Sequence, residues 1–153
     1  MKMLKTFALG LVLTLGGLRG TAQKSAVPLN EPDYNKAKLF ADLPQRMKLK
    51  VKEMEALFSL PVGTVINTQA TDQFKLQGTI VSKAEDATVK SVVIRSTNKQ
   101  GAIFTFTKVS KADGNSNYIG RMISRQHGDA FEIVKENGQY VLNKIEMHDL
   151  LSE

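Results

Sequence analysis

The chain has no cysteine and no tryptophan, and it has only two histidines among its 153 residues. Without cysteine it cannot form a disulfide, and it cannot carry the cysteine-linked lipid of a bacterial lipoprotein. Structural zinc sites use four cysteine or histidine ligands, so this composition leaves little for such a site. The sequence therefore predicts a disulfide-free protein without metal or cofactor, whose core is built from aliphatic side chains and seven phenylalanines.

Long apolar runs are also missing, with one exception at the N-terminus. Lys2 and Lys5 precede the apolar run FALGLVLTLGGL, and small residues follow at positions 20–22. This order is typical of a cleaved secretory signal peptide, and the run is shorter than the roughly 20 residues of a membrane-spanning helix. We expect residues 1–22 to be removed, leaving no transmembrane segment, and the rest to be exported to the periplasm or exterior of a Gram-negative bacterium.

The positive charge is smaller than it first looks. Removal of residues 1–22 takes away Lys2, Lys5 and Arg19 but no acidic residue, so the formal charge falls from +6 to +3. A small charge on an exported chain gives little support for nucleic-acid binding. A protein partner or another component of the cell envelope is the expected partner.

The remaining chain divides into an arm and one domain. Three of the four prolines, Pro28, Pro32 and Pro44, fall within residues 23–44, which predicts an extended arm with one small apolar cluster around Leu39 and Phe40. The arm is either a linker that lies on the domain or a docking segment for a partner. Residues 45–153 are long enough for one domain with a hydrophobic core.

Apolar and polar residues alternate through most of this domain, which is the period of β-strands. Residues 46–52 alternate strictly, and residues 52–60 then place Met54, Leu57 and Phe58 at helical spacing before Pro61. Seven further strands are expected at residues 62–69, 73–83, 88–97, 102–111, 117–126, 130–136 and 139–147. Short turns between them favour antiparallel neighbours. The predicted fold is mainly β: an antiparallel up-and-down meander of about seven strands, curled or barrel-like, preceded by one short helix.

Residues 117–151 are the clearest part of this meander. His127-Gly128 and Asn137-Gly138 each leave room for a two-residue hairpin turn, and the Asn-Gly pair suits the positive φ angles of such a turn. Three consecutive antiparallel strands are therefore expected here.

Catalytic motifs are weak. Ser124, His127 and Asp129 are too close in sequence to form a catalytic triad from a tight hairpin, and His148 is only a distant candidate for a general base. The DGNSN run beginning at Asp113 resembles the start of a calcium loop but lacks its later ligands, which favours a hairpin turn. A hydrolase using His127 or His148 stays an alternative hypothesis.

Binding residues are easier to propose. Arg46, Lys48 and Lys50 lie on one face of the strand at residues 46–52, where they protect a sheet edge or meet an anionic partner. Further candidates are the Phe104 and Phe106 face of one strand and the arginines of neighbouring strands, Arg95, Arg121 and Arg125. These residues favour a non-catalytic binding or interaction module, of which an accessory subunit of a bacterial cell-envelope complex is one form. The other alternative is a barrel-type carrier of a lipid, peptide or glycan.

Overall fold

The computed structural model of the protein describes residues 35–149, so the expected signal peptide and residues 23–34 of the expected arm lie outside it. Its helical elements are α1 (Val51–Glu55) and the 3-10 helix η1 (Ala56–Ser59). Its strands are β1 (Arg46–Lys48), β2 (Val65–Gln69), β3 (Lys75–Glu85), β4 (Val89–Ser96), β5 (Ala102–Ser110), β6 (Ser116–Ser124), β7 (Asp129–Glu136) and β8 (Gln139–Glu146).

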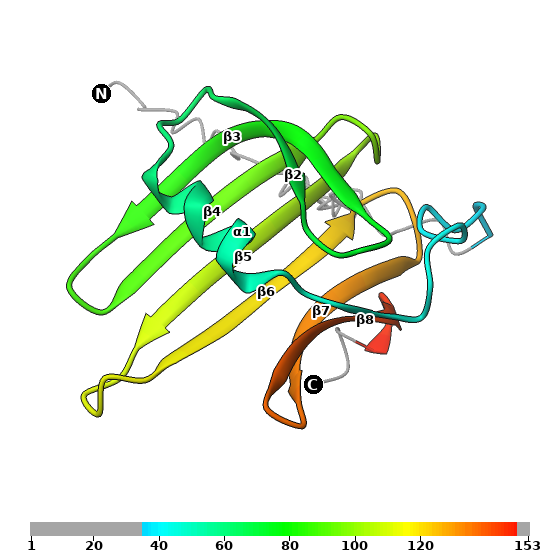
Figure 1. Cartoon of the computed structure of the whole chain (residues 1–153). Coiled ribbons are helices and arrows are strands. Elements are labelled where there is room, and N and C mark those ends of the chain that lie inside the picture. Colours follow the sequence, from blue (N-terminus) through cyan, green and yellow to red (C-terminus); the bar gives the residue numbers. More distant parts are fainter. Residues whose placement is uncertain (1–34, 150–153) are drawn as a thin grey trace, which may run out of the picture.

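All of these strands form one antiparallel sheet with the order β1-β8-β7-β6-β5-β4-β3-β2, which curls into a half-barrel (Figure 1). The predicted antiparallel meander is confirmed. The seven strands expected after the helix are present as β2 to β8, but the sheet has eight strands, because β1 joins it beside β8 with Arg46 opposite Asn143. The helix consequently lies between the first and second strands and does not precede the sheet.

Alternation decides which side chains form the core. In β3, Leu76 and Ile80 are completely buried on the concave face, while Lys75 and Gln77 are exposed on the convex face. The helical segment α1–η1 crosses the concave face (Figure 1). It buries Met54, Leu57 and Phe58 against the sheet, so the space inside the half-barrel is occupied by its own side chains.

Two glycines allow the strong curvature. A Cβ at Gly78 would lie 2.4 Å from the carbonyl oxygen of Arg95, and one at Gly120 would lie 2.1 Å from that of Thr105. Neither contact is possible for a real side chain, so glycine is required where neighbouring backbones approach this closely.

One of the two predicted hairpin turns is confirmed. Asn137 and Gly138 both have positive φ, 49° and 77°, and form the two-residue turn between β7 and β8. The prediction of a two-residue turn between β6 and β7 is wrong, because four residues, 125–128, connect these strands. This longer loop packs on the preceding segment, where His127 Nδ1 lies 2.8 Å from the carbonyl oxygen of Ala37.

The segment before β1 packs on one end of the half-barrel. Phe40 is completely buried, with its ring 5.2 Å from that of Phe131 in an edge-on contact. The buried carboxylate of Asp129 accepts the backbone N–H groups of Leu39 and Phe40, at 2.9 and 2.7 Å. The Lys144 ammonium donates to the carbonyl oxygen of Phe40 at 2.7 Å. This end of the core is therefore completed by residues far from it in sequence.

Candidate functional site

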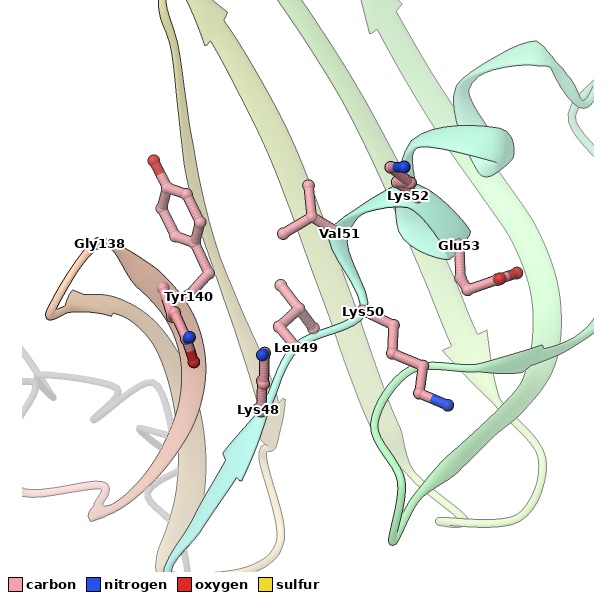
Figure 2. Close-up of a pocket in the computed structure, with 9 residues that line it drawn as sticks. Lys48, Leu49, Lys50, Val51, Lys52, Glu53, Gly138 and Tyr140 are labelled. Atoms are coloured by element: carbon pink, nitrogen blue, oxygen red, sulfur yellow. The ribbon is translucent and has the colours of Figure 1, made fainter.

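A groove forms at the end of β1, where the chain stops pairing with its neighbour β8 and turns into α1. Leu49 still follows the sheet, since its N–H donates to the carbonyl oxygen of Tyr140 at 2.8 Å. Lys50 then turns away, and its N–H donates to the carbonyl oxygen of Ala70 at 2.8 Å. The separation leaves a groove of about 390 Å³, which we call the cationic groove (Figure 2). It is lined by Lys48, Leu49, Lys50, Val51, Lys52, Glu53, Gly138, Gln139 and Tyr140.

Apolar side chains lie between the charges of this groove. Leu49 is buried, Val51 is half-buried, and the Tyr140 ring stands opposite them on β8 (Figure 2). The ring is fixed because the Tyr140 hydroxyl donates to Asn117 Oδ1 at 2.9 Å. The cationic groove therefore combines an apolar wall with charged side chains at its rim.

The lysines of the groove differ in their partners. Lys50 Nζ points away from Tyr140 and pairs with Asp72 Oδ1 at 2.7 Å. Its hydrogen bond lowers the pKa of the Asp72 carboxyl below the ordinary value. The side chains of Lys48 and Lys52 are exposed, and their ammonium groups have no hydrogen-bond or ion-pair partner within residues 35–149. Two ammonium groups are thus available at the rim, with Glu53 the one acidic residue of the lining.

Arg46 lies next to the groove and does not line it. Its guanidinium is 3.7 Å from the Glu136 carboxylate; the Arg46 side chain is largely exposed and that of Glu136 is partly exposed. Of the first predicted set, Lys48 and Lys50 line the groove. The contribution of the β7–β8 hairpin to the groove, through Gly138 and Tyr140, was not predicted, because its proximity to β1 is set by a pairing about 90 residues away in sequence.

The second predicted set is not brought together. Phe104 and Phe106 are completely buried on the concave face and belong to the core, so they offer no exposed binding face. Arg95 and Arg121 are exposed on the opposite, convex face, and Arg125 is exposed in the β6–β7 loop. Period-two alternation shows that residues share a face, but it does not show which face is covered.

The two histidines lie apart from any nucleophile-base relay among the described residues. His127 contacts the Ala37 carbonyl, and the Asp129 carboxylate is occupied by two backbone amides. Ser124 Oγ accepts the Gln126 N–H at 3.3 Å. His148 Nε2 lies 2.8 Å from Asp149 Oδ1, and both side chains are exposed.

A partly buried polar cluster beneath α1 was not foreseen. Glu55 Oε1 accepts from Lys108 Nζ at 2.6 Å and from the Tyr118 hydroxyl at 2.7 Å. The Lys108 hydrogen bond lowers the pKa of the Glu55 carboxyl. Burial, followed by the hydrogen bond to Glu55, raises the pKa of Tyr118 to about 12. All three groups satisfy one another, so the cluster attaches α1 to β5 and β6.

Within residues 35–149 no three histidine, aspartate or glutamate side chains gather as metal ligands. Asp113 caps its own turn instead, accepting the Asn115 N–H at 2.9 Å. In the same part of the chain, neither helix has the length and apolar run that would cross a bilayer. Comparisons with protein-family models, curated proteins and solved structures find no significant match.

Proposed function

We propose that the protein is an exported, non-catalytic interaction module that binds an acidic, partly apolar segment of a cell-envelope partner in the cationic groove. The observation that carries this proposal is the pair of ammonium groups without partners, Lys48 and Lys52, at the rim of a groove whose wall is apolar. A carboxylate of the partner would pair with these lysines, and an apolar side chain would contact Val51 and the Tyr140 ring.

The packed interior supports surface recognition over the carrier alternative. Met54, Leu57 and Phe58 fill the concave face that a barrel-type carrier would use for its ligand. The hydrolase alternative gains no support from His127, whose ring contacts a backbone carbonyl. A recognition role therefore agrees best with the arrangement of the described residues.

A binding experiment with defined probes tests the groove. The probes are two fluorescent peptides of equal length, one alternating glutamate with leucine and one alternating lysine with leucine. We expect the chain from Gln23 onward to bind the acidic peptide and not the basic one, more weakly as salt rises, because salt screens exposed charges. Reversing both rim charges, with Lys48→Glu and Lys52→Glu, should weaken binding about tenfold, a change of roughly 1.4 kcal/mol.

The matched control reverses two exposed lysines elsewhere. Lys75→Glu and Lys111→Glu change the net charge equally but lie at β3 and in the β5–β6 turn, outside the groove. If this variant loses as much affinity as the groove variant, general electrostatics and not the groove accounts for binding, and the proposal fails.

Export is tested separately. We expect the protein recovered from the periplasm or medium of its host to begin at Gln23 and to be absent there when residues 1–22 are deleted. Recovery of an uncleaved chain from the cytoplasm would contradict the envelope assignment without affecting the groove.

A further inference from the structure

Strands β6 and β7 are neighbours in the sheet but pair over only a short length. Their register joins Arg121 to Glu132, Met122 to Phe131 and Ile123 to Ala130, whereas β5 and β6 pair along all nine residues of each strand. Beyond Arg121 and Glu132 the two strands diverge, so that residues 116–120 of β6 and 133–136 of β7 do not pair with each other (Figure 1). We call this region the β6–β7 split.

The direction of the backbone groups follows from the ladders on the other side of β7. The Met147 N–H donates to the Gly128 carbonyl oxygen at 2.7 Å. The backbone N–H and C=O groups of even-numbered residues of β7 therefore point towards β8. The backbone N–H and C=O groups of odd-numbered residues, including Ile133 and Lys135, point towards β6. The same alternation turns the backbone groups of Tyr118 and Gly120 of β6 towards β7, and the Arg121–Glu132 pair places the Ile133 N–H on the Gly120 carbonyl oxygen. Beyond that bond no ladder pair joins the two strands, so Tyr118 has no paired residue in β7.

Side chains close the split on the inner side. The Tyr140 hydroxyl reaches from β8 to Asn117 on β6, and the Tyr118 and Tyr140 rings meet edge-on at 5.1 Å. On the convex side the split is open and forms a depression of about 390 Å³. Its lining consists of Thr105, Thr107, Ile119, Gly120, Arg121, Glu132 and Ile133.

We infer that the β6–β7 split binds an extended segment of a partner polypeptide, which adds to the sheet as a strand. Strand edges beyond the end of a ladder present N–H and C=O groups that are complementary to an extended backbone. Ile119, which is 49% exposed, offers an apolar contact inside the depression. The one cation of the lining, Arg121, stands opposite the one anion, Glu132, so a segment without charged side chains fits best.

This surface is separate from the cationic groove, and the two have no lining residue in common. The groove variant Lys48→Glu, Lys52→Glu should therefore bind at the split normally. Loss of either site leaves the other intact, which makes the two proposals distinguishable.

A reversible clamp tests the inference. Extending the β6–β7 register places Ile119 opposite Val134, so Ile119→Cys with Val134→Cys puts one thiol on each side of the split. The chain has no cysteine of its own, so oxidation can form no other disulfide within the chain, and a monomeric product on a non-reducing gel identifies this bond. The probe is a phage-displayed library of random eight-residue peptides, selected against the wild-type chain.

We expect the selected peptides to alternate apolar and small polar residues and to bind the wild-type and reduced double-cysteine proteins alike. Oxidation should weaken binding at least about tenfold, and a reductant should restore it. Amide exchange gives a direct second readout, since binding should slow exchange at Tyr118, Gly120 and Lys135.

A substitution pair covers the case in which the thiols do not bond. Ile119→Lys should abolish peptide binding, whereas Ile103→Lys, also on the convex face but outside the depression, should not. Failure to select any peptide that protects these three amides, or equal binding to the Ile119→Lys protein, overturns the inference.

Discussion

At the scale of single residues, Asp129 has an unusual position, because its carboxylate is completely buried and accepts hydrogen bonds from two backbone N–H groups. Asp129→Asn replaces one acceptor oxygen by an NH2 group, which then faces an amide donor. A buried donor left unsatisfied costs about 1–3 kcal/mol. We expect a loss of that size in the free energy of unfolding, measured in urea.

Asp113→Asn is the control for this change. Asp113 also accepts a backbone N–H, but it lies in an exposed turn where water replaces lost hydrogen bonds. The variant should unfold close to the wild-type midpoint. Equal losses in the two variants would show that burial of the Asp129 carboxylate has no special effect.

Tyr118 gives a prediction about pH. Its pKa in the folded protein is raised to about 12 from an ordinary value of 10.0, so the folded state holds this proton more tightly than the unfolded state. The associated stability is fully present below about pH 10 and is lost as the pH rises towards 12. In the phenolate absorbance, Tyr118→Phe should remove a component that titrates near pH 12. Removal of a component near pH 10 instead would contradict the raised pKa.

At the scale of elements, the helical segment α1–η1 is held mainly by its apolar face. The Phe58 ring stacks on Phe106 at 5.2 Å between centroids and is 9% exposed. Phe58→Ala removes this contact and leaves a cavity, which typically costs about 3–5 kcal/mol. Chemical denaturation should show a loss in this range. Lys52→Ala, on the exposed side of the same segment, should change the free energy of unfolding little, and a comparable loss there would argue against packing as the cause.

Local patterns predicted the elements that depend on local chemistry. The alternation in β3 and the Asn137-Gly138 turn could be read from neighbouring residues, because side-chain direction and φ preference act within a few positions. The pairing of β1 with β8 could not be predicted, since many strands share the same alternation. The four-residue loop at 125–128 was missed because its shape depends on contact with Ala37.

The same limit applies to the two proposed binding surfaces. Lys48 and Lys50 could be nominated from their strand, but the Tyr140 wall of the groove comes from the partner hairpin. The β6–β7 split had no signal in the sequence, because continuous alternation in both strands predicts continuous pairing. Gly120, a glycine within β6, lies where the sheet bends, but a single glycine in a strand does not predict that pairing stops there.

At the scale of the whole molecule, the two ends of the sheet are joined near one corner. Lys50 contributes both the backbone hydrogen bond to Ala70 and the ion pair with Asp72. Because β1 sits at one edge of the sheet and β2 at the other, this corner connects the first strand to the last in spatial order. Both ends of the described chain also contribute buried side chains to the half-barrel, Phe40 before β1 and Met147 after β8.

The half-barrel includes the segment before β1, which buries Phe40. A domain starting at residue 45 would lack Phe40, which is completely buried, and would leave the Asp129 carboxylate without its two amide donors. Loss of the Phe40 side chain alone should cost about 3–5 kcal/mol, a large part of the roughly 5–15 kcal/mol that stabilises an ordinary domain. We therefore expect a chain starting at Pro44 to melt far below one starting at Gln23, as measured by circular dichroism. Phe40→Ala in the longer chain gives the contribution of the side chain by itself. If the chain starting at Pro44 is as stable as the longer one, residues 35–43 only lie on the surface of a domain that is complete without them.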